Sequence, residues 1–181
     1  MTTWFTSDHH FFHNSIIHHA KRPFSSTEEM NEVMIERWNS RVKRGDLVRH
    51  MGDFSLGRKE ETEKVLRRLN GSLLLVKGNH DKTAIQLKHM FEAVKDLHEV
   101  RIDSQKIVLC HYAMRIWNAS FHDSWHLYGH SHGFLSHDML SLSMDVGVDC
   151  TDFYPISFDE VREIMEKKKS YKDEFCKQRS V

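Results

Sequence analysis

With 181 residues, the chain is long enough to bury a sizeable apolar core, and one domain over residues 1–181 is the simplest expectation. Its 26 Lys and Arg residues balance its 26 Asp and Glu residues, so net charge does not indicate a nucleic-acid or membrane partner. No apolar run approaches the roughly 20 residues that cross a bilayer, so no membrane-spanning segment is expected.

The N-terminal part alternates strand-like and helix-like patterns. In chain order, the predicted elements are a strand at 2–7, a helix from Ser25 or Ser26, a strand at 47–51, a helix at 61–69, a strand at 73–76 and a helix at 84–94. Glu28 and Glu29 stand three residues after the two serines, as in capping boxes. The alternation indicates right-handed βαβ units and a parallel sheet.

The C-terminal part is richer in strands. Its predicted elements are strands at 100–102, 107–109, 125–128 and 140–148, a turn at 103–105, and a last helix opened by Ser157 and Glu160. Strand–helix units followed by strand-rich sequence indicate an α/β fold with two packed, mixed sheets flanked by helices, a four-layer αββα sandwich. Residues 166–181 are strongly polar, and we expect them to form a helical tail that frays.

Five short polar clusters follow the apolar runs that we assign to strands. They are Asp8-x-His10, Gly52-Asp53, Gly78-Asn79-His80-Asp81, His111 and Gly129-His130-Ser131-His132. Ligands gather at strand C-termini in open α/β sheets, so we expect these side chains to converge on one site.

The side chains of these clusters are those that bind divalent metal ions. Two ions that share a carboxylate can bind phosphate oxygens, neutralise developing charge and bridge a water of lowered pKa. Asp53, after the flexible Gly52, is the natural shared carboxylate, and His130 and His132 are spaced to reach different ions. His80 is placed to meet a substrate, and the Asp81 carboxylate could hold the other ring nitrogen of His80.

The order D-x-H, G-D, G-N-H-D, H and G-H-x-H resembles the calcineurin-like metallophosphoesterases, in particular their small single-domain bacterial and phage members. The resemblance runs from Asp8 to about Pro155 and implies the same αββα sandwich. It implies one ion held by Asp8, His10, Asp53 and His132, and a second held by Asp53, Asn79, His111 and His130. It also implies that His80 is the general acid that protonates the leaving oxygen, with Asp81 in support.

The sequence departs from many larger members of that family after G-D. Phe54-Ser55 lacks the further acidic residue of those relatives, so their substrate preference cannot be carried over. We expect a small phosphodiester as substrate, because the compact chain leaves few insertions to enclose a monoester. A phosphomonoesterase and a metal-binding scaffold without activity are the alternatives. Nucleic acid is not indicated by charge, although it stays open as a substrate.

Two divalent ions are the expected cofactors. Mixed Asp, Asn and His ligands suit Mn²⁺, our first expectation, and also Fe²⁺, Ni²⁺, Zn²⁺ and Co²⁺. The three cysteines are widely spaced and form no C-x-x-C pair, which is typical of a reducing compartment, so a cytoplasmic location is expected. The oligomeric state cannot be predicted from the sequence.

Two further residues are candidates for substrate contacts. Arg22 either clamps a phosphate oxygen bidentately or is a solvated arginine in a turn that leads into a helix. His13 either touches substrate or belongs, with His9, His18 and His19, to a solvated polar loop. We expect His50 to be a hydrogen-bonded histidine within the sheet and Cys110 to be a small buried strand residue. His122 and His126 flank the fifth cluster and are further candidates for substrate contact.

Overall fold

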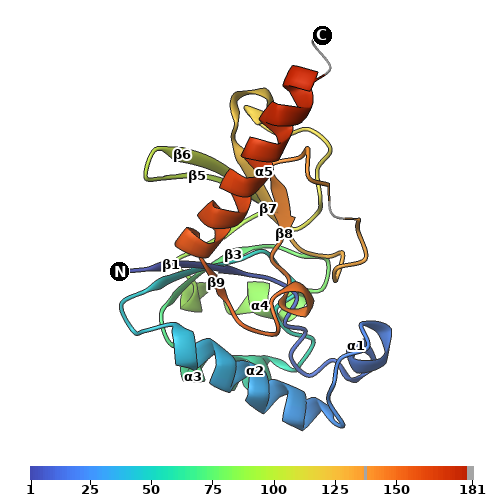
Figure 1. Ribbon diagram of the computed structural model, residues 1–181. Helices are drawn as coiled ribbons and strands as arrows, with labels where there is room; N and C mark the ends of the chain where they lie inside the picture. Colours follow the sequence, from blue (N-terminus) through green and yellow to red (C-terminus); the bar gives the residue numbers. More distant parts are fainter. Residues whose placement is uncertain (137, 179–181) are drawn as a thin grey trace.

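Two mixed β-sheets pack against each other and are flanked by helices (Figure 1). The computed structural model describes residues 1–136 and 138–178. The first sheet has the strand order β4-β3-β2-β1-β9, with β1 (Thr3–Thr6), β2 (Leu47–His50), β3 (Ser72–Val76), β4 (Ala93–Lys95) and β9 (Ile156–Ser157). The second has the order β5-β6-β7-β8, with β5 (Leu97–Ile102), β6 (Gln105–Cys110), β7 (Trp125–Tyr128) and β8 (Ser143–Asp145). The predicted αββα arrangement of two mixed sheets is confirmed.

Strand β3 shows how the first sheet is buried on both faces. Leu73 and Leu75 belong to the core beneath the helices of the N-terminal half, whereas Leu74 and Val76 belong to the core shared with the second sheet. This division follows from the two-residue period of a strand, which turns successive side chains to opposite faces. An apolar run such as 73–76 is therefore what a central parallel strand requires.

The helices are α1 (Asn14–His19), α2 (Thr27–Arg41), α3 (Lys59–Arg68), α4 (Lys82–Gln86) and α5 (Phe158–Gln178), with 3₁₀ turns η1 (Lys88–Met90), η2 (Ser120–His122) and η3 (Val148–Cys150). Ser26 caps α2 by accepting the backbone N–H of Glu29 at 3.1 Å, and the Glu29 carboxylate accepts the Ser25 N–H at 2.7 Å. The capping box before α5 is also present, since the Ser157 hydroxyl accepts the Glu160 N–H at 3.2 Å. Among the described residues, no helix combines the length and apolar character needed to cross a membrane.

The helix predicted at 84–94 is wrong. Helix α4 ends at Gln86, and residues 93–95 instead form β4 at the edge of the first sheet, where Val94 pairs with Leu75 of β3. Of the strand predicted at 140–148, only residues 143–145 form a strand, which is β8. The turn at 103–105 is confirmed: Asp103 and Ser104 have φ of 48° and 69°, the left-handed pair typical of a two-residue hairpin. Helix α5 continues the expected tail to Gln178, and residues 179–181 lie outside the described part.

Candidate metal centre

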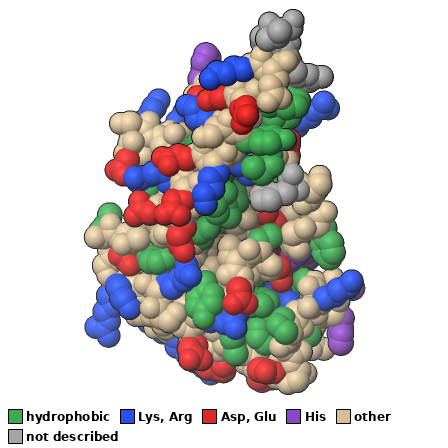
Figure 2. Space-filling model, in the orientation of Figure 1, with side chains coloured by type: hydrophobic (Ala, Val, Ile, Leu, Met, Phe, Trp, Pro, Cys, Tyr) green, Lys and Arg blue, Asp and Glu red, His purple; other side chains and the backbone are tan. Residues whose placement is uncertain are grey.

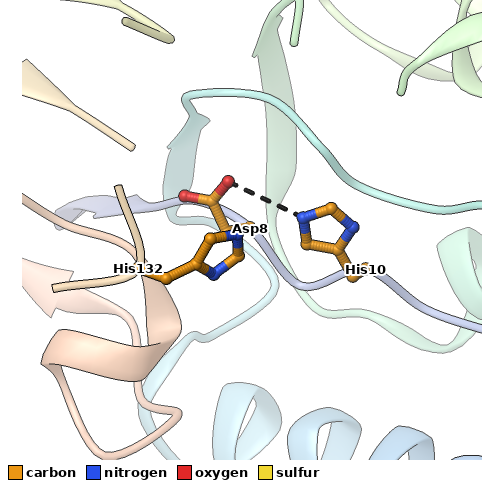
Figure 3. Close-up of side chains that lie close together, drawn as sticks. All are labelled: Asp8, His10 and His132. Atoms are coloured by element: carbon orange, nitrogen blue, oxygen red, sulfur yellow. Dashed lines mark ion pairs between the residues drawn. The ribbon is translucent and has the colours of Figure 1, made fainter. Parts of the chain in front are cut away.

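The candidate ligands converge where strands of both sheets end. Asp8 and Asp53 follow β1 and β2 of the first sheet, whereas His111 and His130 follow β6 and β7 of the second. Two groups result, one of Asp8, His10 and His132 and one of Asp53, His111 and His130, and within each group the ligand atoms lie within 4.8 Å of one another. Figure 3 shows the first group, in which Asp8 and His10 come from one loop and His132 approaches from another.

Asp53 lies between the two groups. Its Oδ2 atom is 3.4 Å from His10 Nε2 and 3.5 Å from His111 Nε2, while its Oδ1 atom accepts the backbone N–H of His80 at 2.8 Å. Burial alone would raise the pKa of Asp53, but the hydrogen bond and charge of His111, with the His80 N–H and His10, lower that pKa to about 2. Asp53 is therefore an ionised carboxylate with one oxygen facing both groups.

Three of the histidines point the same ring nitrogen into the centre. His111 donates its Nδ1–H to the Met51 carbonyl at 2.7 Å, and His132 Nδ1 lies 2.7 Å from the Asp149 carboxylate. His10 Nδ1 contacts His13 Nδ1 at 3.1 Å. These contacts engage Nδ1 and leave Nε2 directed at the carboxylates, which is how a metal-binding imidazole is normally oriented by a partner on its other nitrogen.

Two buried polar atoms in the first group have no hydrogen-bond partner among the residues that the structure describes. They are Asp8 Oδ1 and His10 Nε2, which lie 3.9 Å from each other (Figure 3). Leaving a buried polar atom unsatisfied costs about 1–3 kcal/mol, and a divalent cation between them would satisfy both. Burial also raises the pKa of Asp8 to about 7, a shift that a neighbouring cation would oppose by favouring the carboxylate. The residues present thus fit a metal ion.

The backbone at the centre is held in an uncommon conformation. Five candidate ligands have positive φ: Asp8 (60°), His10 (52°), Asp53 (56°), His130 (66°) and His132 (47°). Residues other than glycine rarely adopt this region, and each such residue costs on the order of 1–3 kcal/mol unless its surroundings enforce it. The positive φ values turn the side chains of Asp8 and His10, and likewise those of His130 and His132, toward the metal centre. No sequence pattern predicts these φ values.

Arg22 and Asp149 form a buried support beneath the first group. Arg22 pairs with both oxygens of Asp149 at 2.8 Å, and it also donates to the carbonyls of Asp8 and His9 and to the sulfur of Met30. These contacts use all five guanidinium donors, and Arg22 is only 5% exposed. The solvated arginine expected from the sequence is therefore wrong, and the structure leaves Arg22 no donor for a phosphate clamp.

Asp81 supports the centre in a different way from the expected one. Its buried carboxylate accepts the backbone N–H groups of Asp53 at 2.9 Å, Phe54 at 2.8 Å and Gly78 at 2.7 Å. In the described structure no hydrogen bond joins the Asp81 carboxylate to the His80 ring, so the expectation that Asp81 holds that ring is wrong. Asp81 instead ties the loop after β2 to the loop after β3, because these amides would otherwise be buried without acceptors.

His80 and Asn79 are exposed at the mouth of the centre. The His80 ring lies 5.5 Å from the His10 ring and 6.0 Å from the His13 ring, measured between centroids. The Asn79 side-chain oxygen lies 3.1 Å from His111 Nε2, beside the second group. His80 thus faces solvent over the first group, and Asn79 adjoins the second.

A family model for the calcineurin-like phosphoesterase superfamily domain matches residues 1–142, most of the chain. The chain belongs to the calcineurin-like phosphoesterase superfamily. The uncharacterized protein MJ1445 from Methanocaldococcus jannaschii is 30% identical to it over 172 residues, which cover 90% of each chain.

Two solved structures are similar to this member of the superfamily. The protein of unknown function AQ665 from Aquifex aeolicus has a TM-score of 0.71 and 24% identity, with 90% of this chain and 98% of that chain covered, and shows the shared fold. Yfce, a phosphoesterase from E. coli, has a TM-score of 0.43 and 17% identity, with 81% and 78% covered.

The other histidines of this calcineurin-like domain divide into buried and exposed ones. His50 is a hydrogen-bonded sheet histidine as predicted, since its Nε2 lies 2.9 Å from His9 Nδ1. His9 itself is fully buried, so its expected place in a solvated loop is wrong, whereas His18 and His19 are exposed as expected. His126, a candidate for substrate contact, is fully buried in β7.

Two acidic residues that support the centre were missed by the sequence analysis. Asp149 holds His132, and Asp145 accepts the Ser131 hydroxyl and the backbone N–H of Gly133 at 3.2 Å, which fixes the loop that carries His130 and His132. Neither lies in a recognisable motif: Asp145 and Asp149 stand 14 and 17 positions after Ser131 and His132, and these separations follow no spacing rule. Cys110 is a buried strand residue, as predicted.

Replacing Asp149 by Asn is expected to weaken metal binding about 10- to 100-fold, as loss of a carboxylate behind a ligand histidine generally does. The amide cannot stabilise the His132 Nδ1–H as a carboxylate does. Titration with Mn²⁺ followed by calorimetry measures the effect. Asp152→Asn is the matched control, since Asp152 pairs with Arg37 at the surface, 3.0 Å away. Equal affinities for the two variants would contradict the role of Asp149.

Replacing Gly129 by Ala is expected to disturb the first group directly. The added methyl would overlap both Ser7 Oγ and Asp8 Oδ2 and lie 2.7 Å from Ser7 Cβ, so the Ser7 and Asp8 side chains must both move. Overpacking of this kind costs about 1–3 kcal/mol of unfolding free energy. Urea unfolding and metal titration measure both effects. Gly45→Ala is the control, because no described atom lies within 4 Å of a methyl added there. Unchanged metal affinity in Gly129→Ala would count against Asp8 as a ligand.

Proposed function

We propose that this chain is a two-metal phosphoesterase that hydrolyses small phosphodiesters. The observation that carries the proposal is the position of Asp53 Oδ2, 3.4 Å from His10 Nε2 and 3.5 Å from His111 Nε2. A carboxylate oxygen so placed can serve two cations at once. One ion would be held by Asp8, His10, Asp53 and His132, and the other by Asp53, Asn79, His111 and His130.

When bound, the ions would neutralise charge on the phosphate oxygens and lower the pKa of an attacking water. The protein's own residues position the reacting groups and supply the proton for the leaving oxygen. The His80 N–H bond to Asp53 Oδ1 fixes the main chain of His80 relative to the shared carboxylate. His80 then protonates the leaving oxygen from the open side of the site, and Asp81 keeps the two loops in register through three backbone N–H groups.

The openness of the site supports a diester rather than a monoester. Asn79, His80 and His130 are all exposed, so a phosphate at the centre has room for a substituent on each side. The chain's 26 Lys and Arg residues balance its 26 Asp and Glu residues, and the two signs are interspersed on the face in Figure 2, so charge does not favour a long polyanionic substrate.

We also propose a metal, a domain organisation and a cellular compartment for this chain. We take Mn²⁺ as the first choice because mixed oxygen and nitrogen ligands suit it. One functional domain over residues 1–181 is supported by the supply of ligands from both sheets. A cytoplasmic location is supported by three cysteines without C-x-x-C spacing.

The test compares a diester and a monoester with the same leaving group. Mn²⁺-loaded protein is expected to hydrolyse bis(p-nitrophenyl) phosphate with a higher kcat/KM than p-nitrophenyl phosphate. A higher kcat/KM for the monoester would identify a phosphomonoesterase instead. Absence of turnover with each of Mn²⁺, Fe²⁺, Co²⁺, Ni²⁺ and Zn²⁺ would favour a metal-binding scaffold.

A further inference from the structure

Tyr112 is an exposed aromatic residue beside the second group of candidate ligands. It directly follows His111, and 47% of its surface is exposed. Its ring centroid lies 4.9 Å from that of His111 and 4.9 Å from that of His130, with interplanar angles of 72° in both pairs. The tyrosine ring therefore touches the edge of the metal centre and remains accessible to a bound molecule.

The main chain after Tyr112 rests on a buried histidine. His126 of β7 donates its Nδ1–H to the Val108 carbonyl at 3.0 Å, and its Nε2 accepts the backbone N–H of Met114 at 3.1 Å. The Trp117 ring packs against His126, with centroids 5.3 Å apart. The Tyr112 carbonyl also lies 3.2 Å from His126 Nε2, so the main chain that carries the ring is held in place and needs no rearrangement when a ligand packs on it.

The rings of Tyr112 and His80 contact different histidines of the centre. The His80 ring neighbours His10 and His13 on the side of the first group, whereas Tyr112 contacts His111 and His130 of the second. If His80 protonates the leaving oxygen, the leaving substituent lies on the first side. The ester substituent that stays on phosphorus is bonded to a different oxygen, and Tyr112 offers it an exposed aromatic ring beside the second group.

We propose that Tyr112 stacks on a planar aromatic ring in the retained ester substituent, so that the preferred substrates are diesters with an aryl or nucleoside group at that position. The inference rests on the proposed function. In the reaction, water adds its oxygen to phosphorus, the bond from phosphorus to the leaving oxygen breaks, and a proton reaches that oxygen. The products are an alcohol or phenol and a monoester that keeps the aromatic group.

The experiment uses three diesters that share the p-nitrophenyl leaving group and differ in the retained substituent, which is methyl, phenyl or thymidine 5′-yl. Mn²⁺-loaded wild-type protein is expected to favour the phenyl and thymidine diesters. Tyr112→Ala should lose about 3- to 10-fold in kcat/KM on these two, mainly through KM, and less on the methyl diester. Tyr112→Phe should retain the preference, because the ring and not the hydroxyl makes the stack.

Binding gives a readout that does not depend on turnover. Thymidine 5′-phosphate should bind the Mn²⁺-loaded wild type more tightly than methyl phosphate, and Tyr112→Ala should remove most of that difference. The control is Tyr171→Ala, since Tyr171 is similarly exposed at 49% but lies on α5. Metal content is measured for each variant.

Two outcomes would overturn the inference. Equal losses on all three diesters would show that Tyr112 only supports His111 and His130, and a wild type without preference for aromatic substituents would exclude stacking. A preference for phenyl over thymidine, or the reverse, would identify which aromatic group the ring accepts. Failure of the wild type to hydrolyse even the methyl diester with any metal would instead overturn the proposed function, and the stacking with it.

Discussion

Replacing Asp53 by Asn is expected to abolish phosphodiester turnover and to weaken both metal sites. The amide can still accept the His80 N–H, but it brings no negative charge to the point between His10 and His111. Loss of several kcal/mol of charge stabilisation, at about 1.36 kcal/mol per tenfold, corresponds to a rate loss on the order of 10³-fold or more. Steady-state kinetics and metal analysis of the same sample measure both effects.

The control for this variant is Asp96→Asn. Asp96 is an acidic residue whose side chain is 87% exposed and pairs with Lys77 at the surface, so its loss should change neither turnover nor metal content. Wild-type turnover by Asp53→Asn at equal metal content would show that the shared carboxylate is assigned to the wrong residue.

Replacing His80 by Ala is expected to leave both metals bound and to slow the reaction about 10²- to 10⁴-fold on a substrate with an alkoxide leaving group, the usual range for a general acid. The imidazole is exposed and only its backbone N–H contacts Asp53, so removing the ring should not disturb the candidate ligands. A p-nitrophenolate leaves with less help from a proton, and the loss on that substrate should be smaller. Rates on both substrates and metal content are measured together.

His89→Ala is the matched control, because His89 is exposed in η1 and takes no part in the centre. Metal loss from His80→Ala would identify His80 as a ligand rather than an acid. Equal losses on the alkoxide and phenolate substrates would show that His80 acts by some means other than protonation.

The candidate ligands could be found from the sequence because strands and the loops after them are local in sequence. Parallel pairing of β1 with β2 brings their C-terminal ends together, and the loops remain paired beyond them: the Asp8 N–H donates to the Gly52 carbonyl at 2.9 Å. A motif placed after each strand is therefore also placed in space. The apolar pattern of each segment is also local in sequence, and it predicted the order of the strands and helices and most of their positions.

The support of the site could not be predicted, because it depends on contacts across long stretches of chain. Arg22 and Asp149 are separated by 127 positions and follow no spacing rule. Positive φ at residues such as Asp8 and Asp53 is imposed by the folded surroundings, since both residues favour other conformations locally. The sequence therefore left Arg22 open between a phosphate clamp and a solvated arginine, and its burial against Asp149 fits neither.

The error at 84–94 has a similar origin. Ala84, Leu87 and Phe91 are all buried at helical spacing, so the apolar pattern fits a helix. The chain nevertheless leaves the helix early, because Ala93 and Val94 supply the edge strand that pairs with β3. Pairing with a distant strand decided the conformation there, and local periodicity did not.

The most direct test of the two-metal centre is anomalous diffraction from a crystal of the protein grown with saturating Mn²⁺. Two anomalous peaks are expected about 3.5–4 Å apart, as in other two-metal hydrolases, with Asp53 in contact with both. Asp8, His10 and His132 should surround one peak, and Asn79, His111 and His130 the other. A single fully occupied peak, or two peaks of which only one touches Asp53, would contradict this expectation.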